Sequence, residues 1–120
     1  MPAEDAPIYK IFRADEWAKA RTQQYFQGSP IDLADGFIHF STAAQARETA
    51  ARHFAGAGEL VLAEIDPSRL AQPLKWEPSR AGQLFAHLYS ALPVGAITKT
   101  WTLSVGPDGR HVFPDELSLE

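Results

Sequence analysis

Residues 35–54, DGFIHFSTAAQARETAARHF, place a short strand directly before a helix, and the rest of the chain can be interpreted around this unit. The segment FIHF at 37–40 is predicted to be a strand, because apolar and aromatic residues fill it. Thr42 and Gln45 have the Thr-x-x-Gln spacing of a capping box. This spacing predicts a helix over residues 43–54, whose alanines form a small-residue face that can pack closely on a sheet.

Upstream of this unit, Ile8–Phe12 is predicted to be a strand, Asp15–Gln24 a helix and Tyr25–Gly36 a loop. Downstream, four further strands are predicted at Leu60–Ile65, Leu74–Trp76, Leu84–Tyr89 and Lys99–Val105. The two helices therefore lie in the first half of the chain, and strands follow one another in the second. This order predicts an α+β fold with a mixed or antiparallel sheet, and it argues against a doubly wound parallel sheet.

The chain has 120 residues, which fits one domain, and we assign residues 8–106 to it, with an N-terminal tail at 1–7 and a C-terminal tail at 107–120. The composition, 45% hydrophobic and 22% charged, is typical of a soluble globular protein. The absence of cysteine excludes disulfides, thiolate zinc sites, iron–sulfur clusters and a cysteine nucleophile.

The formal net charge is −4 and no run of Lys or Arg occurs, so a nucleic-acid partner is not expected. The N-terminus lacks a basic segment followed by an apolar one, and the longest apolar run is too short to span a bilayer. These features predict a cytoplasmic protein without a membrane partner. A small nucleotide pocket stays possible, because it needs only one or two cations.

A first polar group interrupts the apolar strand at 37–40. Alternation puts Ser41 on the same side of the chain as His39, and Ser41 lies at the start of the predicted helix. A histidine, a hydroxyl and a helix N-terminus together suit a phosphate or a ribose. The alternative is a buried structural histidine, with Ser41 or Thr42 acting only as a helix cap.

A second polar group spans KWEPSR at 75–80 and FAHLY at 85–89. His87 and Tyr89 share one face of the second predicted strand, and Trp76 could stack on a flat ring. The alternative is a surface loop beside a core strand with one hydrogen-bonded histidine.

Arg80 follows Pro78 and Ser79 in a predicted loop, where a guanidinium can bind a phosphate or carboxylate through two hydrogen bonds. A metal site built on His39 and His87 would need a third ligand, and no ligand spacing supports one. We therefore expect no metal.

Four blocks of the sequence resemble a small bacterial family known as domain-of-unknown-function family 952. The resemblance runs from about Ile8 to Trp101 and is carried by DGFIHFST at 35–42, AQARETAARHF at 44–54, KWEPSR at 75–80 and FAHLY at 85–89. It implies a fold similar to that of the ADP-ribosyltransferase superfamily, in which a split, strongly bent sheet holds NAD in a central cleft.

The resemblance also implies roles for particular residues, matched by residue type and segment. His39 with Ser41 would contact a ribose or phosphate, Arg80 would bind the pyrophosphate, and His87 with Tyr89 would line the nicotinamide end. The catalytic candidates are His87, His39 and Glu77. The candidates for binding substrate are Ser41, Thr42, Trp76, Ser79, Arg80 and Tyr89.

One departure from the superfamily pattern concerns the glutamate that often lies on a late strand. Neither Leu84–Tyr89 nor Lys99–Val105 contains a glutamate, and Glu77 is predicted to lie in a loop before Pro78. The RNA 2′-phosphotransferase branch manages with His and Arg groups, but this chain lacks the basic surface expected for RNA. The resemblance thus implies an enzyme that uses NAD for ADP-ribosyl transfer. The missing late-strand glutamate supports the alternative, a nucleotide-binding module without catalysis.

Overall fold

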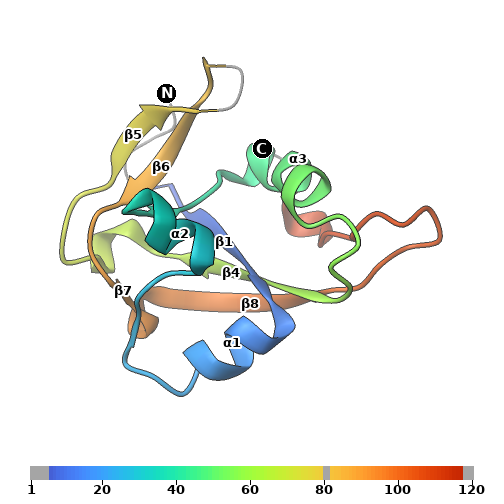
Figure 1. Ribbon diagram of the computed structural model, residues 1–120, viewed down its shortest axis with the longest axis horizontal. Helices are drawn as coiled ribbons and strands as arrows, with labels where there is room; N and C mark the ends of the chain where they lie inside the picture. Colours follow the sequence, from blue (N-terminus) through green and yellow to red (C-terminus); the bar gives the residue numbers. More distant parts are fainter. Residues whose placement is uncertain (1–5, 80–81, 118–120) are drawn as a thin grey trace.

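The strands of the protein form three small antiparallel sheets in a computed structural model, which describes residues 6–79 and 82–117 (Figure 1). The first sheet has the order β1-β4-β8, with strands at Ile8–Arg13, Leu60–Ile65 and Ile97–Leu103. The second has the order β3-β6-β5, with strands at Ile38–His39, Leu84–Leu88 and Lys75–Pro78. The third pairs β2 (Tyr25–Phe26) with β7 (Leu92–Pro93).

The described α-helices are α1 (Ala14–Ala20), α2 (Pro30–Asp35) and α3 (Ala43–His53). The predicted capping box is confirmed, because the backbone N–H of Gln45 donates to Thr42 Oγ1 at 3.2 Å and the N–H of Thr42 donates to Gln45 Oε1 at 3.1 Å. Short 3₁₀ turns lie at Pro67–Arg69, Val94–Ala96 and Asp115–Leu117. None of the described helices has the length and apolar character needed to cross a membrane.

A pair of backbone hydrogen bonds joins the two three-stranded sheets. The N–H groups of Tyr9 and Ser41 each donate to the other residue's carbonyl at 2.8 Å. This bridge holds the end of β3 against β1, so His39 and Ser41 lie beside the side chains of β1. This bridge therefore fixes the position of the first polar group, which consists of His39 and Ser41.

The core is divided between two clusters of buried side chains. Phe12, Phe40 and Leu88 belong to the cluster between the sheets. Leu60 and Leu103 belong to the cluster beneath α3, which also contains Leu117. Residues 107–117, which we assigned to a tail, therefore contribute a buried side chain to the domain.

The α+β class is confirmed, but several element predictions were wrong. The described strands form three antiparallel sheets rather than one bent sheet, and α1 ends four residues earlier than predicted. The predicted loop 25–36 contains β2 and α2. Strand β5 continues through Pro78, so Glu77 lies on a strand opposite Phe85 and not in a loop.

Candidate functional site

A cavity of about 510 Å³ lies where β1, α2, β3, α3 and β6 meet. Its volume is within the usual range of small-molecule sites. Four of the predicted site residues line it, namely His39, Ser41, Ser79 and His87. Its wall also carries the basic side chains of Lys10, Arg13 and His53 and the acidic side chains of Glu16, Asp32 and Asp35.

One wall of the cavity is a cluster of charged side chains around Asp32, which is only 2% exposed. The Lys10 ammonium donates to both Asp32 carboxylate oxygens, at 2.8 and 3.1 Å. His39 directs Nδ1 at Asp32 Oδ1 (2.6 Å) and Nε2 at Asp35 Oδ2 (2.9 Å). Backbone N–H groups of Ser29 and His39 also donate to the Asp32 carboxylate, at 2.9 and 3.2 Å. The cluster therefore joins β1, α2 and β3 at one buried carboxylate.

The charged partners change the pKa values of the two buried members. Burial by itself would raise the pKa of Asp32, but the hydrogen bond from His39 and the charge of Lys10 hold it well below its ordinary value. Burial lowers the pKa of Lys10, and the Asp32 carboxylate opposes this effect. Asp32 is therefore ionised throughout the neutral range.

We expect this cluster to make the protein sensitive to acid. The folded pKa of Asp32 lies below its unfolded value of about 4, so its contribution is complete above that pH and is lost as the pH falls towards the folded pKa. The free energy of unfolding should therefore fall below about pH 4 more steeply in the wild type than in Asp32→Asn. Urea denaturation at several pH values measures this, and parallel curves for the two proteins would contradict it.

A second group of polar and aromatic side chains surrounds His87 of β6. In the β3–β6 pairing His87 lies directly opposite His39. His87 is 4% exposed, and its Nδ1 lies 2.7 Å from Glu77 Oε1. Its Nε2 is buried and has no hydrogen-bond partner among the described residues. A buried polar atom without a partner is uncommon, and it costs about 1–3 kcal/mol.

An aromatic contact holds the His87 ring, and a second hydrogen bond holds its partner Glu77. The Phe37 ring stacks on His87 with a centroid distance of 4.0 Å. The Tyr89 hydroxyl donates to Glu77 Oε1 at 2.8 Å. The hydrogen bonds from His87 and Tyr89 lower the pKa of Glu77, and the bond to Glu77 raises the pKa of Tyr89. Glu77 is therefore an anionic acceptor at neutral pH.

Hydroxyl groups complete the cavity wall near the start of α3. Ser41 Oγ lies 3.1 Å from Thr49 Oγ1, and the Thr49 hydroxyl donates to the Gln45 carbonyl. The Thr49 proton is used in that bond, so Ser41 donates to Thr49 and keeps its own lone pairs for another donor. Thr42, by contrast, caps α3 and does not line the cavity.

The remaining predicted residues lie around this wall. Glu77 bonds His87 Nδ1, and Tyr89 bonds Glu77. Trp76 is partly buried and packs against the core cluster between the sheets. Arg80 lies outside the described residues. The described part of the chain contains no group of three or more His, Asp or Glu side chains that could hold a metal ion.

The sequence interpretation missed Lys10 and Asp32 as members of the site. Lys10 is the only charged residue within the apolar segment IYKIF, and that interruption was the available signal. Asp32 follows Ser29 by three residues, the spacing of a helix N-terminus, but the surrounding Gly and Pro residues favoured a loop.

Comparisons with other proteins place this chain in a family. The family model described as "Protein of unknown function (DUF952)" matches residues 11–100. The chain belongs to this family. The predicted family resemblance is therefore confirmed, and the match covers all four sequence blocks that suggested it. None of the curated proteins compared with the chain matches it.

Solved structures of one relative share the DUF952 protein's fold. Protein CC0527 from Caulobacter crescentus, seen in an X-ray crystal structure, has 46% identity and a TM-score of 0.87, with 95% of this chain and 100% of that chain covered. The crystal structure of a double mutant of that protein gives 45% identity, a TM-score of 0.86 and the same coverage. Its solution NMR structure gives 46% identity and a TM-score of 0.81, with 95% and 98% covered. At this identity the DUF952 chain and CC0527 share their architecture.

Proposed function

We propose that this DUF952 protein binds NAD, or another nucleotide of the ADP-ribose class, in the 510 Å³ cavity and transfers the ADP-ribosyl group. The observation that supports this proposal best is the buried Nε2 of His87, which lacks a hydrogen-bond partner among the described residues although His87 is one of the residues that line the cavity. The hydroxyl group of an acceptor bound beside the nucleotide would supply the missing hydrogen bond. Histidine is the side chain best suited to move a proton near neutral pH.

Glu77 selects the form of His87 that this chemistry needs. Its carboxylate can only accept a hydrogen bond, so His87 Nδ1 carries the proton and Nε2 of the neutral ring carries a lone pair. A carboxylate orients the histidine of a Ser-His-Asp triad in the same way. Nε2 can therefore accept a proton from a hydroxyl group or from water.

The proposed reaction is a substitution at the carbon that joins ribose to nicotinamide. The glycosidic C–N bond breaks, and its electron pair leaves with neutral nicotinamide. The oxygen of the acceptor forms a bond to the same carbon, and its proton passes to His87 Nε2. The products are the ADP-ribosylated acceptor, nicotinamide and one proton, which His87 later releases to solvent.

The position of Glu77 removes one argument against this chemistry. The sequence interpretation placed Glu77 in a loop and found no glutamate on a late strand. In the structure Glu77 lies on β5, beside β6, and its carboxylate reaches His87. A strand carboxylate therefore acts through His87, although Glu77 itself does not line the cavity.

We expect ADP-ribose and NAD to raise the melting temperature of the wild type in a saturable way. A ligand at 100 times its dissociation constant stabilises the folded state by about 2.7 kcal/mol. Ser41→Ala removes a lining hydroxyl and should weaken binding by about tenfold, because a ligand hydroxyl loses its acceptor. Ser104→Ala, on an exposed residue outside the cavity, is the control and should bind like the wild type.

Calorimetric titration and an assay of nicotinamide release separate the two candidate functions. Absence of binding at millimolar ADP-ribose and NAD would overturn the nucleotide proposal. Binding without nicotinamide release would support the binding module instead. One observation favours that second candidate, since both ring nitrogens of His39 already face carboxylates and His39 is not available as a second proton carrier.

A further inference from the structure

Strand β8 differs from the other sheet edges in the described residues. It is the outer strand of its sheet, it has seven residues, and it contains no proline. The other edges are shorter or covered: β5 has four residues and ends at Pro78, β3 has two residues, and β1 is bridged to Ser41. Proteins usually block a long edge, because its free backbone groups pair readily with another strand.

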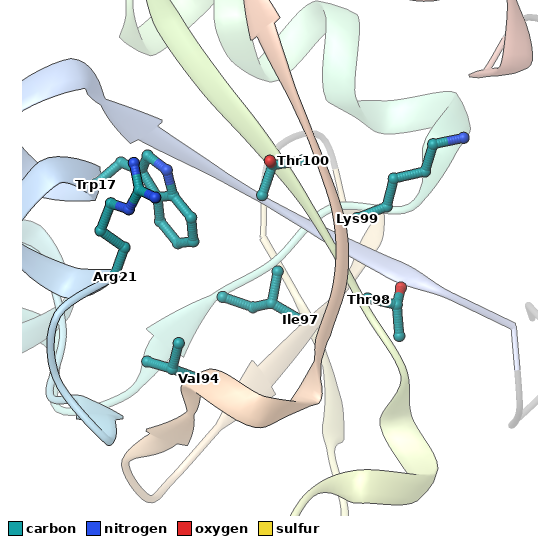
Figure 2. A pocket seen from close by; sticks show the side chains of 7 residues that line it. All are labelled: Trp17, Arg21, Val94, Ile97, Thr98, Lys99 and Thr100. Carbon is teal, nitrogen blue, oxygen red and sulfur yellow. The ribbon is translucent and has the colours of Figure 1, made fainter.

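The surface beside β8 has room for such a partner. A groove of about 330 Å³ is lined by Trp17 of α1, by Arg21 directly after that helix, by Val94 and by Ile97–Thr100 (Figure 2). Consecutive strand residues point to opposite faces, so a groove that touches four in a row follows the edge of the strand. Beyond the pairing with β4, no backbone hydrogen bond of Thr98–Leu103 is found in the described part of the chain.

From this edge we infer that the protein forms a two-fold dimer in which β8 pairs antiparallel with β8 of a second copy. The register that fits is centred on Thr100, so that Thr100 lies opposite Thr100 of the second copy and Lys99 opposite Trp101. A register shift in the β4–β8 pairing is confined to the start of β8, and Lys99–Leu103 pairs regularly. The pairing would extend the three-stranded sheet to six strands across the dimer.

Charge complementarity selects this register. Lys99 is the only charged residue of β8, and in this register it does not face its own copy, which would place like charges opposite each other. It faces Trp101 instead, whose indole N–H donates to Glu116 Oε1 at 3.2 Å. Glu116 Oε2 also accepts from Lys99 of the same chain at 2.6 Å. Within one chain Lys99 also lies over the Trp101 ring, with Nζ 5.0 Å from the ring centroid. Across the two-fold axis the Lys99–Glu116 pair of one copy would lie beside the same pair of the other copy, so that opposite charges face each other.

A register shifted by two residues fits the side chains less well. It would place Lys99 opposite Leu103, which is fully buried in the second core cluster. The exposed threonines Thr100 and Thr102 remain on the solvent side in the Thr100-centred register, where Thr100 meets its own copy. Threonine pairs of this kind stabilise antiparallel strands.

The absence of cysteine from the chain makes a cross-linking test direct. In the proposed dimer the two Thr100→Cys side chains are direct cross-strand partners, with Cβ atoms about 5 Å apart, close to disulfide geometry. The matched control is Thr102→Cys, an equally exposed threonine on the same strand. Its two copies would lie about 13 Å apart, because four residues separate them along the strand.

We expect sedimentation equilibrium to show a wild-type dimer, and diamide oxidation to convert Thr100→Cys to a covalent dimer at least about tenfold faster than Thr102→Cys. Equal rates for the two variants would overturn the Thr100-centred pairing. A wild type that stays monomeric, with no covalent Thr100→Cys dimer, would overturn the proposal and leave the edge to a strand from another protein. Unchanged melting temperatures of the reduced variants confirm that both are folded.

Discussion

Replacing Asp32 with asparagine should lower the free energy of unfolding by about 3–5 kcal/mol, which is the usual effect of removing one partner of a buried ion pair. The substitution leaves the Lys10 ammonium buried without an anion. It also leaves too few acceptors, because N–H groups of Lys10, His39 and Ser29 converge on the two carboxylate oxygens and asparagine offers one. Urea denaturation monitored by circular dichroism measures the loss.

The matched control for this prediction is Asp35→Asn. Asp35 bonds the same histidine, but its side chain is 43% exposed, so the change should be within about 1 kcal/mol. Equal losses for Asp32→Asn and Asp35→Asn would contradict a structural role for the buried cluster. If Asp32→Asn does not fold, Lys10→Met provides a second test, since it removes the cation and keeps the other donors to Asp32.

The elements that the sequence predicted best are those determined by local chemistry. Strand β4 has the predicted bounds, and α3 begins after Thr42 as its capping box requires. The alternation at 84–89 placed His87 and Tyr89 on one face, and both side chains bond Glu77. These features depend on residues two to four positions apart, which the sequence displays directly.

The elements that were missed depend on where proline and glycine lie within an element. Pro30 was interpreted as part of a loop, but it occupies the first turn of α2, where its missing N–H costs nothing. Gly36 ends that helix in the left-handed region, with φ 88°. Pro78 was interpreted as a strand breaker, but β5 is an edge strand and tolerates a terminal proline.

The partners of the site residues could not be predicted, because they come from distant segments. Polar residues in apolar strands identified His39 and His87 as candidates, and their pairing follows from the β3–β6 register. The carboxylate that bonds His39 Nδ1 comes from α2, and the carboxylate that bonds His87 Nδ1 comes from β5. Neither element was predicted with its correct bounds. The different chemical availability of the two histidines therefore emerged only from the structure.

The largest effect on activity is expected for His87→Gln, which removes the proposed proton acceptor and keeps a side chain of similar length. Loss of a positioned acid–base group lowers turnover by about 10²–10⁴-fold. Nicotinamide release from NAD should fall by this amount in kcat, while KM changes little, because His87 acts on the acceptor proton rather than on the nucleotide. The control is His111→Gln, since His111 lies outside the cavity and bonds the Gly58 carbonyl at 2.6 Å.

Glu77→Gln distinguishes an oriented histidine from one that merely fills space. The amide can present its N–H₂ group to His87 Nδ1, which then becomes the acceptor and moves the ring proton to Nε2. Turnover should therefore fall in kcat almost as far as in His87→Gln, whereas Tyr89→Phe, which keeps the Glu77–His87 bond, should retain most of it. Full activity of Glu77→Gln would show that the carboxylate does not set the tautomer. Full activity of His87→Gln would remove His87 from the mechanism and leave only the binding of ADP-ribose in the cavity to be tested.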